Sequence, residues 1–126
     1  MPDVDRMLDS VILIDHLNGV SKATDYLRNL APERTAVSVI TRAEILVGME
    51  GSDIDEAKNL LDKFVLLSID GPIADKAAEL RRKYGWKLPD AFQAALAIQN
   101  NAKLVTRNTK DFDPNRHKFV EVPYVI

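Results

Sequence analysis

The segment over residues 88–112 places the tightest limit on what this chain can fold into, because a helix pattern, a buried strand and a polar loop follow one another there. Pro89 suits the first position of the helix, where its missing N–H removes no hydrogen bond, and Asp90 then lies near the positive end of the helix dipole. Small residues share a face with Asp90, whereas Gln93 and Asn100 are expected to face solvent. Asp90 therefore points inward, where a carboxylate needs a partner.

A second acid follows the strand of this segment. The apolar pair Leu104 and Val105 runs into a polar stretch over residues 106–108, and Asp111 comes shortly afterwards. Parallel α/β sheets bind their ligands at the carboxyl ends of their strands. We therefore expect Asp90 and Asp111 to converge on one edge of a sheet.

The rest of the chain alternates short apolar strand patterns with amphipathic helix patterns, and it contains no repeats or low-complexity segments. This alternation is typical of a parallel sheet with helices on both faces. We therefore predict an α/β fold, a three-layer α/β/α sandwich, formed by a single domain over residues 1–126. The strands are predicted over 7–9, 35–38, 65–69, 104–105 and 119–122, and the helices over 11–18, 22–30, 39–49, 54–64, 71–84 and 89–101.

The first strand places Asp9 at its carboxyl end if Ser10 caps the helix that follows. The competing interpretation is one strand that continues through Ile14, because this run is apolar and β-branched. Asp15 is the rival of Asp9 in this region, although a helix carries it more than a turn away from the strand end.

Glu44 lies beside the apolar face of the helix predicted over residues 39–49. A capping box with Thr41 would explain an acid at this position. If Ser38 caps the helix instead, Glu44 lies a turn and a half inside it and needs another reason to point at the core. The apolar face is predicted to consist of Ile40, Ala43 and Val47.

Composition limits the chemistry that the chain can carry out. The absence of cysteine excludes disulfides and thiolate metal sites and favours the cytoplasm, and two histidines are too few for a zinc site built from histidine. We expect neither a membrane protein nor an exported one, because the sequence has no apolar run of about 18 residues and no signal-peptide pattern. The net charge of −2 becomes positive once four candidate metal-binding acids are left aside, so the net charge does not exclude RNA as a partner.

Four acids are predicted at strand ends or on helix faces that meet the core: Asp9, Glu44, Asp90 and Asp111. Carboxylates gathered in a low dielectric repel one another, so such a cluster persists when it is protonated, paired with bases or bound to cations. Oxygen ligands without histidine or cysteine suit Mg²⁺ or Mn²⁺. The matching chemistry is hydrolysis of a phosphodiester bond. Side chains that could orient the carboxylates or metal-bound water are Ser10, Thr41, Thr106 and Asn108.

Four sequence blocks resemble those of PIN-domain ribonucleases, in the same order and across nearly the whole chain. The blocks are Leu8–Asp15, Ser38–Glu44, Leu88–Ala91 and Leu104–Phe112. Within that family they are most similar to VapC-type toxins of bacterial and archaeal toxin–antitoxin pairs.

The resemblance implies a PIN-like fold with a mostly parallel five-stranded sheet. It also implies a Mg²⁺- or Mn²⁺-dependent endoribonuclease that acts on tRNA or ribosomal RNA, forms a homodimer and is inhibited by a small DNA-binding antitoxin, the cognate VapB-type protein. In that family, Asp9, Glu44, Asp90 and Asp111 would be the metal-binding catalytic acids.

Each acid also has a purely structural explanation, as a turn, a cap or a first-turn residue that the helix dipole stabilises. Asp113 rivals Asp111, but Pro114 follows it and favours a turn. One alternative function is a non-catalytic PIN-like module that binds RNA or protein. Another is a phospho-receiver-like signalling domain, although the chain lacks the paired acids after its first strand and the lysine after its last strand that a receiver needs.

Basic side chains could form a rim that holds RNA phosphates, with Arg42, Lys87 and Arg107 as candidate contacts and solvated helix faces as the alternative explanation. Trp86 could stack on an unpaired base, although its pattern favours packing under the neighbouring helix. Met7 is an alternative start to Met1, or the residues ahead of it lengthen the first strand.

Overall fold

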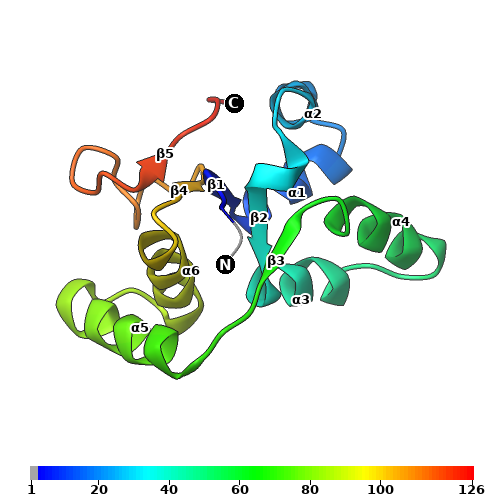
Figure 1. The fold of residues 1–126 in the computed structure, drawn as a ribbon. Coiled ribbons are helices and arrows are strands. Elements are labelled where there is room, and N and C mark those ends of the chain that lie inside the picture. Colours follow the sequence, from blue (N-terminus) through cyan, green and yellow to red (C-terminus); the bar gives the residue numbers. More distant parts are fainter. Residues whose placement is uncertain (1–2) are drawn as a thin grey trace.

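A central sheet of five parallel strands organises the protein, whose computed structural model describes residues 3–126 (Figure 1). The strand order is β3-β2-β1-β4-β5, and each pair of neighbours is parallel. The predicted α/β/α sandwich with five strands is therefore confirmed. The strands are β1 (Arg6–Leu8), β2 (Thr35–Ser38), β3 (Val65–Leu67), β4 (Lys103–Val105) and β5 (Val120–Glu121).

Helices cover both faces of the sheet. In Figure 1, α5 and α6 lie on one side of the sheet, and α1, α3 and α4 lie on the other with α2 beside α1. A short 3-10 helix, Pro32–Arg34, leads into β2. The α-helices are α1 (Ser10–Leu17), α2 (Ser21–Arg28), α3 (Val39–Val47), α4 (Ser52–Leu61), α5 (Gly71–Tyr84) and α6 (Leu88–Gln99).

The chain leaves the central strand β1 in two directions. It first adds β2 and β3 on one side of β1, and it later returns to add β4 and β5 on the other side. Open parallel sheets bind ligands at such a switch point, beyond the carboxyl ends of the strands. Asp9 and Thr106 come directly after β1 and β4, so both lie at this point.

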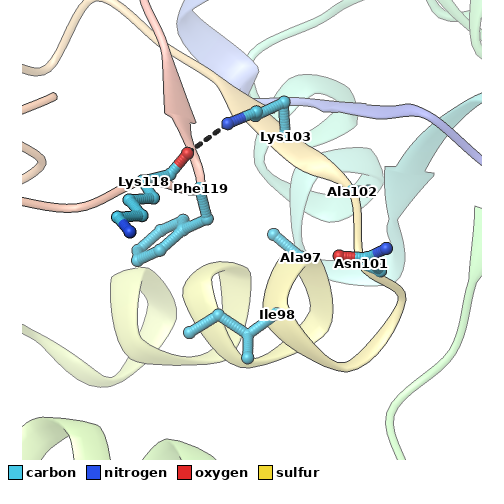
Figure 2. A pocket seen from close by; sticks show the side chains of 7 residues that line it. All are labelled: Ala97, Ile98, Asn101, Ala102, Lys103, Lys118 and Phe119. Carbon is cyan, nitrogen blue, oxygen red and sulfur yellow. Dashed lines mark hydrogen bonds between the residues drawn. The ribbon is translucent and has the colours of Figure 1, made fainter.

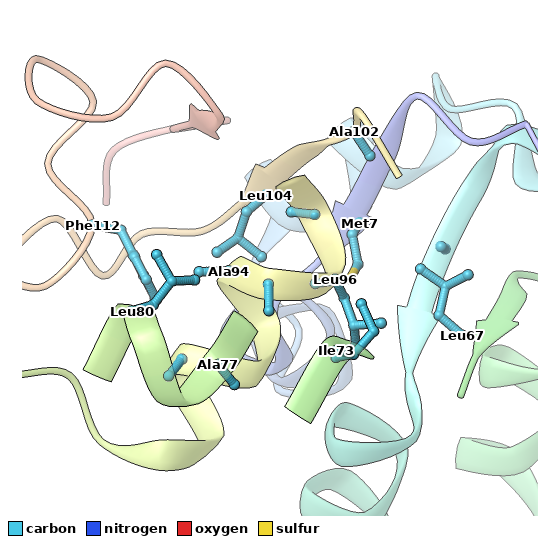
Figure 3. Close-up of a cluster of buried hydrophobic side chains, with 14 of the residues drawn as sticks. Met7, Leu67, Ile73, Ala77, Leu80, Ala94, Leu96, Ala102, Leu104 and Phe112 are labelled. Atoms are coloured by element: carbon cyan, nitrogen blue, oxygen red, sulfur yellow. The ribbon is translucent and has the colours of Figure 1, made fainter. Parts of the chain in front are cut away.

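Two apolar clusters hold the helices to the sheet. Successive strand residues point to opposite faces, so Met7 of β1 enters one cluster and Leu8 enters the other. Figure 3 shows the first cluster, where Leu80 of α5 lies beside Phe112 of the loop after β4, and Leu96 of α6 lies beside Ile73 of α5. The second cluster joins the other face of the sheet to α1, α3 and α4.

Polar side chains cap the start of two helices. The Ser38 hydroxyl accepts a hydrogen bond from the Thr41 N–H at 3.1 Å, and the Asp70 carboxylate accepts one from the Ile73 N–H at 3.0 Å. Because Ser38 caps α3, the alternative capping box of Thr41 with Glu44 is wrong. Glu44 therefore lies inside the helix and not in its first turn.

The predicted cap of α1 is wrong by one residue. Asp9 is the cap, and its Oδ1 atom accepts a hydrogen bond from the Ser10 N–H at 2.9 Å. Ser10 is the first residue of the helix, which the prediction began one residue later. The alternative of one strand through Ile14 is also wrong, because β1 ends before Asp9.

The predicted apolar face of α3 is wrong. Val47 is 86% exposed and Ala43 is exposed, whereas Thr41 and Ile45 are buried. Thr41 points inward because its N–H donates to the Ser38 hydroxyl oxygen and its own hydroxyl oxygen accepts a hydrogen bond from Gln93 of α6. α3 also ends at Val47, with Gly48 as its C-cap, and does not continue to residue 49.

Arg6 lengthens the predicted first strand by one residue, and the backbone of Asp5 bonds to the segments on either side of it. The Asp5 N–H donates to the Arg34 carbonyl at 2.8 Å, and the Asp5 carbonyl accepts from the Lys103 N–H at 2.9 Å. Met1, one of the two candidate starts, lies outside the described residues. Across residues 3–126, no helix combines the length and the apolar composition that crossing a membrane requires.

Candidate active site

Both carboxylate oxygens of Asp9 are held by hydrogen bonds at the carboxyl end of β1. Oδ1 accepts from the Ser10 N–H at 2.9 Å, and Oδ2 accepts from the Thr106 hydroxyl at 2.7 Å. The Asp9 N–H in turn donates to the Val105 carbonyl at 2.9 Å. Only 9% of Asp9 is exposed. The carboxylate is therefore fixed in direction by donors from its own strand end and from the neighbouring one.

Asp111 lies in a loop that is stabilised by its own polar side chains. The Asn108 side-chain amide donates to Asp111 Oδ2 at 3.1 Å, and the Asn108 N–H donates to the Thr106 hydroxyl oxygen at 3.0 Å. The indole N–H of Trp86 donates to the Asp111 carbonyl at 2.9 Å. Thr106 and Asn108, two of the predicted orienting residues, thus each donate to one of the predicted acids.

Trp86 is buried and packs among aromatic rings. It stacks on Tyr84 with ring centroids 4.5 Å apart, and its ring centroid lies 5.0 Å from that of Phe112. Only 5% of Trp86 is exposed. Trp86 is therefore a packed core residue, as its pattern favoured, and its hydrogen bond ties this cluster to the loop that carries Asp111.

Asp90 and Glu44 enter the same region from opposite helical layers. Asp90 lies in the first turn of α6 and is half-buried, and Pro89 is the second residue of that helix, not the first as predicted. Glu44 lies on α3 and is more exposed than Asp90. The predicted stripe of small residues on α6 is confirmed, because Ala94 and Ala97 are fully buried.

The electrostatics of Asp90 and Glu44 link the four acids. Desolvation raises the pKa of Asp90, and the charges of Asp9 and Asp111 raise it further, while Lys87 lowers it. Desolvation also raises the pKa of Glu44, with added repulsion from Asp9 and Asp90. Asp9 acts on both groups, so all four predicted acids lie in one electrostatic environment.

These carboxylates present hard oxygen donors of the kind that Mg²⁺ and Mn²⁺ prefer. As the side chains lie, no three acidic or histidine residues within the described chain are grouped so that they could hold a metal ion directly. Mg²⁺ usually keeps several waters and takes few protein ligands. The donor set therefore fits a divalent cation by its chemistry and by the mutual repulsion that a cation would relieve.

The predicted RNA contacts differ in what their side chains do. Arg42 forms an ion pair with Asp62 at 2.9 Å. Arg107 donates from Nε and from a terminal nitrogen to both oxygens of Asp15, at 2.7 and 2.9 Å. Lys87 is exposed and lies close enough to Asp90 to lower its pKa.

Asp15 has a structural role that sequence reasoning missed. Its carboxylate is buried, and besides the guanidinium of Arg107 it accepts a hydrogen bond from the Tyr124 hydroxyl at 2.8 Å. The hydrogen bond from Arg107 is the largest cause of its lowered pKa. Asp15 is therefore a satisfied ion-pair partner and not a rival of Asp9.

Gln93 is the second residue that sequence reasoning placed wrongly. It was predicted to face solvent, but only 2% of it is exposed, and its side-chain amide bonds to Ser38 and Thr41. The available signal was its position in a run of apolar residues just after Asp90. A polar residue in such a run needs a buried partner.

A separate cavity of about 310 Å³ lies near the amino end of β4 (Figure 2). The end of α6 and the segment before β5 complete its walls, and the Lys103 ammonium donates to the Lys118 carbonyl beside it. Its lining contains alanine, isoleucine, asparagine, lysine and phenylalanine side chains, and no described acid. The four acids therefore do not belong to this cavity.

Residues 6–116 match the family model of the PIN domain. The chain belongs to the PIN-domain family. Two relatives of this PIN-domain chain are the ribonucleases VapC10 and VapC19 of Mycobacterium tuberculosis. VapC10 is 32% identical over 112 residues, which cover 84% of this chain and 84% of VapC10. VapC19 is 30% identical over 114 residues, which cover 85% of this chain and 91% of VapC19.

Solved structures share the same PIN-domain fold. A chain of a toxin–antitoxin complex from Klebsiella pneumoniae is 34% identical with a TM-score of 0.86, and the match covers 97% of this chain and 100% of that one. A chain in the structure of FitAB bound to an IR36 DNA fragment has a TM-score of 0.83, with 96% of each chain covered. At 23% identity, that second likeness bears on the fold alone.

Proposed function

We propose that this PIN-domain protein is a metal-dependent endoribonuclease and the toxin of a VapBC-type toxin–antitoxin pair. The observation that carries the proposal is the shared electrostatic environment of Asp9, Glu44, Asp90 and Asp111 at the switch point of the sheet. Its relatives at 30% and 32% identity are ribonucleases by name, which supports the same chemistry here.

Asp9, Asp90 and Asp111 would hold Mg²⁺ or Mn²⁺, with Glu44 assisting. When bound, the metal supplies a Lewis acid that polarises a phosphate oxygen and lowers the pKa of water. The repulsion that raises the pKa of Asp90 and Glu44 supports this assignment, because it would be relieved by a bound cation.

The chain's own residues would orient the acids and receive the RNA. Thr106 and Asn108 hold one oxygen each of Asp9 and Asp111, so these carboxylates need little reorganisation during the reaction. Lys87 is exposed beside Asp90 and would contact an RNA phosphate. Arg42 and Arg107 would reach RNA only by leaving or sharing their ion pairs.

Attack of water on the RNA phosphorus, with the 3′ oxygen as leaving group, leaves a 5′-phosphate and a 3′-hydroxyl end. A mechanism that used the neighbouring 2′-hydroxyl would instead leave a 2′,3′-cyclic phosphate. Mass spectrometry of the cleavage products distinguishes the two, and cyclic phosphate ends would refute the proposed hydrolysis.

The central experiment is cleavage of a total tRNA and ribosomal RNA pool with Mg²⁺, Mn²⁺ or EDTA. Three proteins are compared: the wild type, Asp90→Asn, and Asp75→Asn as a control that removes an exposed acid of α5. Circular dichroism checks that each is folded. We expect discrete cuts by the wild type and by Asp75→Asn, lost with EDTA and in Asp90→Asn. No cleavage by the folded, antitoxin-free wild type would favour a binding module instead.

We further propose a homodimer that acts in the cytoplasm and is silenced by a cognate antitoxin. The likeness to a chain of a toxin–antitoxin complex supports the antitoxin partner. An antitoxin peptide would cover the acids and offer an arginine to the carboxylates. Co-expression with the adjacently encoded protein should abolish cleavage, and unchanged activity would refute this partner. Sedimentation equilibrium measures the proposed dimer directly.

A further inference from the structure

The Gln93 side chain forms a closed hydrogen-bond network inside the protein. Its Oε1 atom accepts from the Ser38 hydroxyl at 2.5 Å, and its Nε2 atom donates to the Thr41 hydroxyl oxygen at 2.7 Å. The Thr41 N–H completes the ring by donating to Ser38 Oγ at 3.1 Å. Gln93 is 2% exposed, and Ser38 and Thr41 are fully buried. Water therefore cannot easily replace any of these bonds.

This network lies one helical turn from two of the acids. Gln93 follows Asp90 by three residues on α6, and Thr41 precedes Glu44 by three residues on α3. Residues three apart in a helix share a face. The bond between Gln93 and Thr41 therefore joins the second turn of α6, just after Asp90, to the first turn of α3, just before Glu44.

The two joined helices belong to opposite layers of the sandwich (Figure 1). α6 is held mainly by α5 and the sheet, and it makes little backbone contact with α3. The other buried side chains of α6 are Ala91, Ala94, Ala95, Leu96 and Ala97. Small side chains allow close approach but set the position along the helix axis weakly, whereas hydrogen bonds are directional.

We propose that Gln93 is a positioning residue, which fixes the spacing of Asp90 and Glu44 by tying α6 to the start of α3 through Ser38 and Thr41. The proposal rests on the nuclease function proposed above. A displacement of about 1 Å in a reacting constellation can cost about a hundredfold in rate. Loss of this tie should therefore slow the reaction much more than it weakens RNA binding.

The decisive variants remove the hydrogen bonds and keep the volume. Gln93→Met leaves a side chain of similar length without polar atoms, and Thr41→Val removes one hydroxyl. Thr35→Val is the matched control, because Thr35 is 2% exposed and its hydroxyl donates to the Ala31 carbonyl at 2.8 Å, at the other end of β2. Thr41→Ser keeps the hydroxyl and tests for rescue.

Three quantities are measured for each variant: the urea unfolding midpoint, kcat and KM for a cleaved RNA, and the Kd of Mn²⁺ from titration calorimetry. We expect Gln93→Met and Thr41→Val to lose about tenfold to a hundredfold in kcat, because the spacing of Asp90 and Glu44 would change, and to bind Mn²⁺ more weakly for the same reason. KM should change by less than about twofold. Thr35→Val should lose about as much stability as Thr41→Val but keep the wild-type kcat. Thr41→Ser should keep both the wild-type stability and the wild-type kcat.

Equal kcat values for Gln93→Met, Thr35→Val and the wild type would overturn the positioning role, and so would a loss confined to the unfolding midpoint. A wild type that neither cleaves RNA nor binds Mn²⁺ would overturn the proposed function, and this inference with it. A wild type that cleaves RNA while Gln93→Met cleaves equally well would overturn only the inference.

Discussion

Replacement of Arg107 by methionine should destabilise the protein, because it leaves a buried carboxylate without its cation. Arg107 donates two hydrogen bonds to Asp15, at 2.7 and 2.9 Å, and Tyr124 donates a third at 2.8 Å. The side chains of Asp15 and Arg107 are 10% and 28% exposed. Methionine keeps most of the length of the arginine stem, so the change removes mainly the charge and its hydrogen bonds.

The burial of this pair sets the expected loss of stability. Removing one partner of a fully buried ion pair costs about 3–5 kcal/mol, whereas exposed pairs contribute about 0–1 kcal/mol. Because Arg107 remains partly solvated and Tyr124 still donates to Asp15, we expect about 2–3 kcal/mol. For a chain of this size that lowers the unfolding temperature by roughly 6–12 °C.

A second arginine provides the control for burial. Arg34 also donates two hydrogen bonds to a carboxylate, that of Asp5, each at 2.7 Å. Their side chains are 49% and 50% exposed, so water screens the pair. Arg34→Met should therefore lose far less stability than Arg107→Met in urea denaturation at neutral pH.

The ion pair of Arg107 with Asp15 also predicts how the difference in stability between the wild type and Arg107→Met depends on pH. The hydrogen bond from Arg107 lowers the pKa of Asp15 in the folded state, against a value of about 3.9 in the unfolded chain. Its stabilisation is thus present above the unfolded value and is lost as the pH falls through the folded pKa. The gap between wild type and Arg107→Met should shrink in acid. A pH-independent gap, or equal losses for Arg107→Met and Arg34→Met, would refute this reasoning.

Three further outcomes follow from the site and the fold. Asp90→Asn should raise the urea midpoint at neutral pH but not below about pH 4. The raised pKa of Asp90 means that its carboxylate destabilises the folded state once the pH rises through that pKa, and asparagine removes this charge. Mg²⁺ added to EDTA-treated protein should raise the unfolding temperature by mass action, and less so in Asp90→Asn, as scanning calorimetry would show. Gly85→Ala should cost about 1–2 kcal/mol in chemical denaturation, because Gly85 has φ of 74° at the end of α5. Gly71→Ala, at a negative φ with open space around the Cβ position, should not.

Local signals were sufficient to predict most of the fold. β2 covers Thr35–Ser38 and α5 covers Gly71–Tyr84 as predicted, and the structure shows α5 capped by Asp70 at its start and by Gly85 at its end. In each case the boundary depends on a side chain that bonds within one turn or on a φ that only glycine adopts easily. The convergence of the acids followed from topology, because strand ends in a parallel sheet meet at one edge.

The errors concern residues whose surroundings come from distant parts of the chain. Gln93 was expected at the surface because polar residues usually are, but its partners lie 52 and 55 residues away in sequence. Val47 was expected in the core because it continued an apolar pattern, but the inward face of α3 follows from Thr41 and Ile45. A helical pattern gives a face only approximately, and tertiary partners decide which polar residue turns inward.

The arrangement of apolar and polar contacts explains how the protein tolerates a cluster of repelling acids. Its two apolar clusters lie on the faces of the sheet, where they supply stability. At the carboxyl edge, directional hydrogen bonds hold Asp9 and Asp111, and Gln93 ties α6 to α3. Much of the stability therefore comes from apolar contacts, whereas hydrogen bonds fix the direction of the carboxylates. A cavity made by Leu61→Ala on α4, a helix that carries none of the four acids, should lower stability by about 2–5 kcal/mol yet leave kcat of the folded fraction nearly unchanged. Gln93→Met should instead lower both stability and kcat.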